Sequence, residues 1–294
     1  MQPRALTLLM LALRFASCRS GQGEELRLNA FTEAGELAQV TFAAKGVTKC
    51  SPAVGFVLDD DLGVLIHCYP RPSLLSVQMS RTIEWMDKVG VCAIGYNADC
   101  LRLKTDWRGV VENHKFIFGE PPSVKKIASK LSLVLTSGLY PDRGASDKET
   151  PFARPLAASV LFLARECGDG EVEKGLECGG FQLLQLDNSG ALYQCHQRSV
   201  TALGTITKHS EDLSAIADIV ASHRQQPTAA ALADTVERVA THLFQHVQRD
   251  STGESAEIDC ECECLAIDAR GKGHFLVART PELLRSALLS SLSN

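Results

Sequence analysis

Short apolar runs and longer segments with helical periodicity follow one another in a fixed order along this chain, and that order limits the folds open to it. Apolar residues spaced three and four apart in 30–47 predict a helix that begins after Gly35. Short apolar runs bounded by turn residues predict strands at Ala53–Leu58, Gly63–Cys68, Ile83–Trp85, Val89–Ile94, Ala157–Ala164, Gly180–Asp187, Leu192–Arg198, Ile258–Asp268 and Gly273–Val277. Further helices are expected at Asn97–Phe116, Val124–Ser137, Leu213–Ser222, Ala229–Val247 and from Pro281 onward.

Groups of strands that alternate with pairs of helices predict stacked antiparallel sheets with helices on the outside. We therefore expect an α+β fold, a four-layer αββα sandwich. The chain has 294 residues, of which 45% are hydrophobic, and this suffices for a single domain over 24–294. The polar stretches 140–150 and 167–179 are expected to be insertions in solvated loops.

Charge and hydropathy exclude two classes of partner. The net charge is −5 and the basic residues are scattered, which gives no electrostatic footprint for nucleic acid. Beyond the N-terminus no apolar segment approaches the roughly 18 residues that a membrane span needs, so we expect no membrane insertion.

The first 23 residues are expected to lie outside the fold. Arg4 precedes the apolar run Ala5–Leu13, and Arg14 and small residues follow it, which is the outline of a secretory signal. An upstream-extended start codon or an amphipathic leader would give the same pattern. A signal would imply a secretory or organellar location.

Eleven cysteines, an odd number without metal-ligand spacing, argue against a disulfide-stapled scaffold. Cys260, Cys262 and Cys264 alternate with acidic residues, so in a strand their thiols share one face. A buried stripe of thiols is the main interpretation and a metal cluster the alternative. Cys167 and Cys178 would be free in a reducing compartment and could pair in an oxidising one.

Six motifs in order resemble the α-type subunits of the 20S proteasome, over about Phe31 to Leu288. The first combines FTEAGELAQVTFAAKGV at Phe31–Val47 with SPAVG at Ser51–Gly55. The later motifs are Asp87–Cys100, Glu112–Val124, Arg154–Ala157, Leu183–Cys195 and Thr201–Thr205. Gln194, Cys195 and the polar stretch before Arg154 are most similar to α type 5. The resemblance implies the fold of the N-terminal nucleophile hydrolases, which is the sandwich already expected.

The resemblance also implies that this chain is not an enzyme, although its complex is a threonine-type endopeptidase. Catalysis in this fold uses an N-terminal Thr whose free amine acts as base. Ser51 matches the nucleophile, but the helix of Phe31–Val47 precedes it and Pro52 follows it. Tyr69 matches the supporting carboxylate and Arg81 the lysine, and an arginine stays charged. No catalytic, cofactor or metal residues are therefore expected.

By resemblance, the first helix contacts neighbouring α subunits in an outer ring of seven that controls substrate access. The matched interface positions are Phe31, Gly35, Leu37, Gln39, Val40 and Ala43. The implied partners are other α subunits, β subunits and a regulatory particle, with unfolded proteins as the transported substrates of ubiquitin-dependent degradation. The implied location is cytoplasmic and nuclear. Residues 24–26 depart from the family's Tyr-Asp-Arg, so its gate contacts are not carried over.

Two alternatives remain open at this point. The first is a self-processing hydrolase that uses Cys50 or Ser51 as its nucleophile, because cleavage before either residue would create a new N-terminus. The second is an α-type paralogue that works outside the proteasome.

Overall fold

A computed structural model describes residues 31–58, 61–71, 81–137, 154–165, 180–195, 199–223, 228–251 and 259–293. The leader 1–23 and the predicted insertions at 140–150 and 167–179 lie outside these ranges, as do Cys167 and Cys178. No helix in the described ranges is long and apolar enough to cross a membrane.

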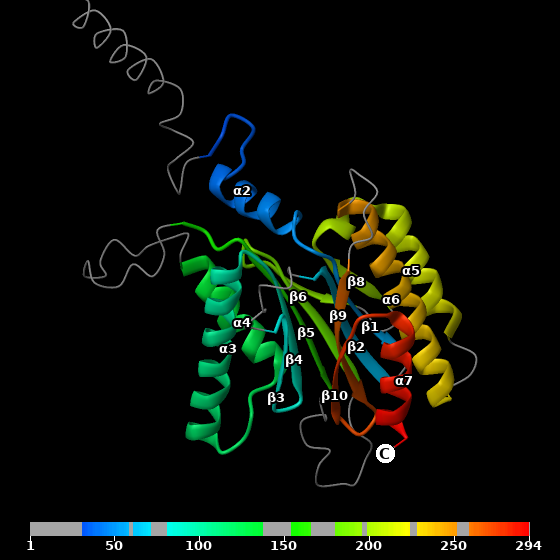
Figure 1. Ribbon diagram of the computed structural model, residues 1–294. Helices are drawn as coiled ribbons and strands as arrows, with labels where there is room; N and C mark the ends of the chain where they lie inside the picture. Colours follow the sequence, from blue (N-terminus) through cyan, green and yellow to red (C-terminus); the bar gives the residue numbers. More distant parts are fainter. Residues whose placement is uncertain are drawn as a thin grey trace, which may run out of the picture.

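Two five-stranded antiparallel sheets stack at the centre of the molecule (Figure 1). In the first sheet the strand order is β10 (Gly273–Ala278), β9 (Cys260–Asp268), β2 (Leu62–Pro70), β1 (Ala53–Leu58) and β8 (Val200–Leu203). In the second sheet the order is β3 (Ile83–Met86), β4 (Val89–Gly95), β5 (Ala158–Arg165), β6 (Phe181–Leu186) and β7 (Leu192–Cys195).

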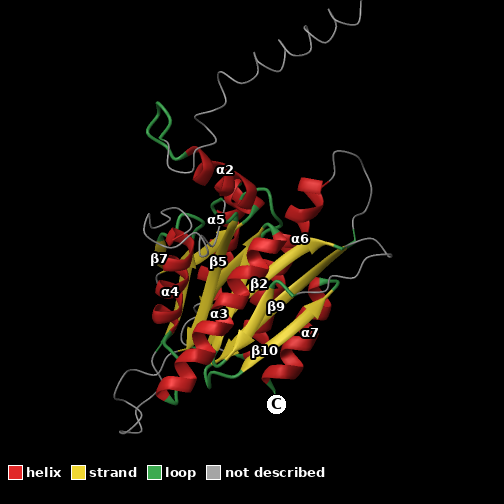
Figure 2. Cartoon of the chain, turned by 90° about the vertical axis from the view of Figure 1, so that its left-hand side faces the viewer, coloured by secondary structure: helices red, strands yellow, loops and turns green. Residues whose placement is uncertain are grey.

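Helices cover both outer faces, which completes the four layers (Figure 2). On the second sheet lie α3 (Asn97–Phe118) and α4 (Val124–Ser137). On the first lie α5 (Ser210–Ser222), α6 (Ala229–Ser251) and α7 (Pro281–Leu292). The short 3-10 helix η2 (Thr205–Lys208) leads into α5, and α2 (Ala38–Val47) lies across one end of the sandwich. The α+β sandwich predicted from the sequence is confirmed.

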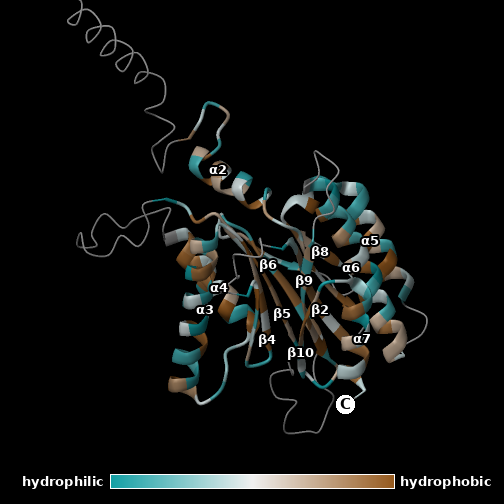
Figure 3. Cartoon of the chain, in the orientation of Figure 1, coloured by the Kyte–Doolittle hydropathy of each residue, from teal (hydrophilic) through white to brown (hydrophobic). Residues whose placement is uncertain are grey.

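Three apolar layers hold the sheets and helices together (Figure 3). Because side chains alternate along a strand, neighbours in β2 serve different layers. Leu65 points between the sheets, whereas Ile66 points toward α6. Trp107 of α3 is the largest fully buried side chain and fills the layer under α3 and α4.

Several details differ from the expected elements, and the first is that α2 begins at Ala38 and not directly after Gly35. No strand is predicted at Val200–Leu203, yet these residues form the edge strand β8. Four residues are too few to show a period. The helical spacing over Asn97–Phe116 includes Leu101, but this residue is 50% exposed and lies off the buried face of α3. That face consists of Cys100, Leu103, Lys104, Trp107 and Val111.

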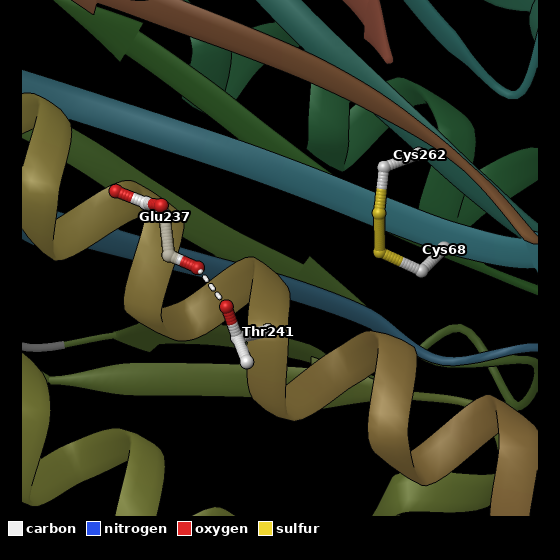
Figure 4. Close-up of a disulfide and its surroundings, with 4 residues drawn as sticks. All are labelled: Cys68, Glu237, Thr241 and Cys262. Atoms are coloured by element: carbon white, nitrogen blue, oxygen red, sulfur yellow. Dashed lines mark hydrogen bonds between the residues drawn. A yellow bond between two sulfur atoms is a disulfide. The ribbon is translucent and has the colours of Figure 1, made fainter. Parts of the chain in front are cut away.

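The expectation of unpaired cysteines is wrong for one pair. Cys68 of β2 and Cys262 of β9 lie directly opposite each other and form a disulfide (Figure 4). Cys260 and Cys264 are buried on the same face, as predicted, and lie outside this disulfide. The pair was not identified because its members are 194 residues apart in sequence.

Candidate functional site

The chain enters the sandwich through a segment that we call the arm, residues 31–47. At its start Phe31 and Leu37 form an antiparallel bridge, and Thr32 accepts the N–H of Gly35 at 2.8 Å. Gly35 has φ +79°, which favours glycine at this turn. The arm then continues as α2, which projects beyond the sheets at one end (Figure 1).

All six predicted interface residues lie on the arm, but they differ in exposure. Phe31 is 69% exposed and Gly35 is exposed, whereas Leu37, Gln39 and Val40 are half-buried. Ala43 is only 8% exposed, because it lies on the face of α2 turned to the sandwich. Phe42 was not predicted, yet it is 50% exposed beside this set.

Side-chain and backbone bonds fix α2 on the sandwich. Asn188, after β6, donates its side-chain N–H to the carbonyl of Val40 at 3.1 Å. The other end is held where Thr205 donates its backbone N–H to the carbonyl of Cys50 at 2.8 Å. A Cβ on Gly204 would lie 2.4 Å from the Ser51 oxygen, so only glycine permits this approach.

Thr205 also begins a buried polar relay. Its Oγ1 lies 3.0 Å from His246 Nε2, and His246 Nδ1 lies 2.8 Å from Asp212 Oδ2. Burial would raise the pKa of Asp212, but hydrogen bonds from Arg249 and His246 outweigh it and lower that pKa. The order resembles a Thr-His-Asp triad. Because Thr205 is 7% and His246 2% exposed, the hydroxyl is closed to substrate and the relay ties η2, α5 and α6 together.

A pocket of about 640 Å³ opens at the foot of α2. Arg154 at its wall is held by Asp99 through two bonds of 2.7 and 3.0 Å. The same carboxylate accepts the N–H of Ala157, so the wall is rigid. The lining residues are Gly46, Cys50, Gly95, Tyr96, Asn97, Arg154 and Ala157.

The two candidate nucleophiles lie at this junction. The backbone nitrogen of Cys50 is part of a peptide bond and not a free amine, because the chain continues into it from α2. Its N–H donates to the carbonyl of Val47. Its thiol donates to the Gly46 carbonyl at 3.4 Å, and burial raises its pKa. The thiol is thus protonated near neutral pH and is a poor nucleophile. Ser51 is half-buried, and its amine is likewise part of the chain.

Tyr69 and Arg81 have been drawn into other contacts. Tyr69 donates to Glu263 Oε1 at 3.4 Å, and burial raises its pKa. Glu263 Oε2 accepts the backbone N–H groups of Thr82 and Ile83, each at 2.8 Å. The guanidinium of Arg81 lies over the ring of Phe275, 4.4 Å from its centroid. Neither side chain is arranged for proton transfer to Ser51.

Lys104 of α3 was missed by the sequence argument. Its side chain is 3% exposed, lies 3.2 Å from Glu84 and donates to the carbonyl of Arg81. The family pattern expects a lysine at the position of Arg81. Lys104 lies beside the backbone carbonyl of that position, but its charge is already paired with Glu84. The signal was available, since Lys104 shares a helical stripe with Cys100 and Trp107.

His67 completes a cluster of polar groups at one end of the space between the sheets. Burial, and secondly the charge of Lys104, lower the pKa of His67 to about 3, so it is neutral. Within the described part of the chain, its Nδ1 has no hydrogen-bond partner. We call Glu263, Tyr69, Lys104, Glu84 and His67 the inter-sheet polar cluster. Across the described ranges no three His, Cys, Asp or Glu side chains form a metal-binding group.

Comparison with known proteins gives no matching family model, but several proteasome subunits are similar. Proteasome subunit alpha type-5 of Drosophila melanogaster is 26% identical over 166 residues, which is 55% of this chain and 62% of that protein. The Caenorhabditis elegans type-5 subunit is 25% identical over 60% of this chain and 64% of its own length. Proteasome subunit alpha 2 of Haloarcula marismortui is 24% identical over 59% and 63%.

The match thus spans less than two thirds of each of these relatives. Such relatives imply the N-terminal nucleophile hydrolase fold, and the two stacked antiparallel sheets agree with it. The resemblance is therefore confirmed: this chain is similar to proteasome α-type subunits at 23–26% identity, and type 5 is the most frequent among them.

Proposed function

We propose that this chain is a non-catalytic structural α-type subunit of a 20S proteasome core. In this proposal it belongs to an outer ring of seven and controls substrate access for ubiquitin-dependent protein degradation. The observation that carries the proposal is the arm, whose aromatic residues Phe31 and Phe42 are 69% and 50% exposed. The matched relatives are themselves proteasome α subunits.

Exposed aromatic residues on a projecting element favour a protein partner. Covering a phenylalanine side chain contributes about 1.5–3 kcal/mol, and obligate interfaces are rich in such residues. Phe31 and Phe42 would supply the apolar part of a contact with a neighbouring α subunit. Gly35, Leu37, Gln39, Val40 and Ala43 would shape that contact, since they fix the path of the arm and its angle to the sheets.

A second exposed apolar cluster favours contact in another direction. Phe116, Ile117 and Phe118 at the end of α3 are 91%, 68% and 61% exposed. The arm and this helix end belong to different parts of the molecule (Figure 2). A subunit within stacked rings needs separate contacts to ring neighbours and to the next ring. We assign the end of α3 to the β-type subunits.

The junction at Cys50 and Ser51 supports a non-catalytic role. A nucleophile in this fold needs a free amine, whereas here α2 continues into β1 and the junction is tied to Thr205. The raised pKa of the Cys50 thiol also argues against a role as nucleophile. These features make a self-processing hydrolase the weaker candidate.

The remaining parts of the proposal follow from the same assignment. The partners are other α and β subunits and a regulatory particle, and unfolded proteins pass through the complex. The location is cytoplasmic and nuclear. Residues 24–294 form one domain, and 1–23 are a leader outside it.

Co-expression with the other α-type subunits of the same source tests the proposal. Native mass spectrometry should find this chain in rings with them. Phe31→Ser with Phe42→Ser should reduce incorporation more than tenfold, while the matched control Leu283→Ser, at a 57% exposed site on α7, should not. A chain that stays monomeric in every mixture would contradict the proposal.

A further inference from the structure

Three cysteines of β9 lie on one face of its sheet, opposite a single cysteine of β2. Cys262 pairs in register with Cys68, and Cys260 and Cys264 flank it two residues away on each side. The Cα atoms of Cys68 and Cys262 are 4.2 Å apart. The pairing of the two strands in this register therefore brings the two cysteines within reach of each other.

The alternation of Cys and Glu in β9 makes more than one register conceivable. A shift by two residues keeps every side chain on its present face, so the face alone does not select the register. Such a shift would bring Cys260 or Cys264 opposite Cys68. It would also move Glu263 away from the N–H groups of Thr82 and Ile83. Cys262 and Glu263 lie on opposite faces of β9. The disulfide on one face and the hydrogen bonds of Glu263 on the other therefore both favour the observed register.

The pair is closed to reagents once the domain has folded. Cys68 and Cys262 are each 0% exposed. Figure 4 shows the disulfide on the side of the sheet that faces α6. Val236, Val239, Ala240 and Leu243 of this helix belong to the same buried apolar cluster as the two cysteines. A thiolate must reach the sulfur that it attacks, so exchange requires α6 to leave the sheet.

Exchange among the neighbouring thiols is also suppressed in the folded chain. Burial raises the pKa of Cys264 to about 12, and burial and then Asp259 raise that of Cys260. Because the thiolate is the attacking species, neither residue rearranges the bond readily. The bond present in the folded protein is the one that formed during folding.

We propose that Cys68 and Cys262 form a redox-dependent lock on the register of β9, which closes when the chain folds under oxidising conditions, stays open when it folds under reducing ones, and resists reductant once closed. The reaction is thiol–disulfide exchange with a small disulfide such as oxidised glutathione. One cysteine thiolate attacks the small disulfide and releases one thiol, and the second cysteine thiolate attacks the mixed disulfide and releases the other. Two protein thiols are oxidised, one small disulfide is reduced to two thiols, and the protons pass to the departing thiolates.

Refolding of the full chain tests this lock. After refolding with oxidised glutathione, peptide mapping should find Cys68 joined to Cys262. The folded, oxidised protein should be reduced by a phosphine more than about tenfold slower than the same protein in guanidinium, because reduction must await opening. Equal rates, or a majority of Cys68 joined to Cys260 or Cys264, would overturn the proposal.

Two matched variants sharpen the test. Cys262→Ser should abolish the difference in melting temperature between protein folded with and without oxidised glutathione. Cys264→Ser removes a buried thiol from the same strand and face, and it should keep that difference. If Cys262→Ser does not fold, the melting temperatures of wild-type protein folded with and without oxidised glutathione decide the test. A wild-type chain with equal melting temperatures in both states would contradict the lock.

Discussion

The arm and the inter-sheet polar cluster depart from ordinary burial in opposite ways. The arm holds aromatic rings in solvent, whereas the cluster holds a lysine, a glutamate and a histidine inside the protein. Glu263 and Lys104 find their partners within the chain, through Thr82, Ile83, Glu84 and Arg81. Phe31 and Phe42 remain largely exposed in the single chain.

This contrast indicates what each region is for. Buried polar groups that are satisfied internally specify one packing of the sheets, and they would be costly to break. Exposed apolar groups contribute little to folding and become favourable only when a partner covers them. The cluster therefore serves the fold, whereas the role that we propose for the arm is assembly.

The largest effect is expected at Glu263. Glu263→Ala removes the acceptor of two buried backbone N–H groups and should lower the free energy of unfolding by about 3–5 kcal/mol. Glu263→Gln keeps one carbonyl acceptor and should lose less. Urea unfolding measures both. Equal stability of wild type and Glu263→Ala would show that the cluster does not support the fold.

His67 should make stability depend on pH. Its folded pKa of about 3 lies below the unfolded value of 6.5, so its contribution is complete above 6.5 and is lost as the pH falls toward 3. Between pH 7 and 5 the loss should be about 2 kcal/mol. His67→Met should remove that part of the dependence in urea unfolding. If the two proteins show the same pH profile, His67 is not buried in its neutral form.

Asn188 connects the arm to the sandwich. Asn188→Ala removes the bond to the Val40 carbonyl and should cost about 1 kcal/mol. Hydrogen exchange should quicken in α2 more than in α6, because only α2 loses an anchor. Uniform quickening in both helices would indicate general destabilisation instead of a loosened arm.

The exposed rings of the arm should matter least for the isolated chain. Phe31→Ser and Phe42→Ser should each change the free energy of unfolding by less than about 0.5 kcal/mol, as is usual for surface sites. Thermal unfolding of the single chain measures this. A loss as large as that expected for Glu263→Ala would place these rings in the fold and not in an interface.

The sequence predicts regions of this molecule to different degrees. The layers follow from periodicity, because α6 is strongly amphipathic and β2 is a continuous apolar run. The short strand β8 carries too little pattern to be identified. The Cys68–Cys262 pair and the cluster around Glu263 join β2, β9 and α3, which are far apart in sequence, so only the folded chain brings them together.

The candidate site was predicted in part for a similar reason. The position of the arm follows from the resemblance, but exposure depends on which face α2 turns to the sheets, and Ala43 lies on the buried face. Phe42 was missed because the matched motif gives no reason to single it out.

The most direct test of the proposed role is mass spectrometry of the protein captured from its native extract, recording its N-terminus and the chains that accompany it. We expect an N-terminus upstream of Phe31, an intact arm and co-purifying α- and β-type subunits. A solitary chain that begins at Cys50 or Ser51 would contradict the proposal and indicate a self-processing hydrolase.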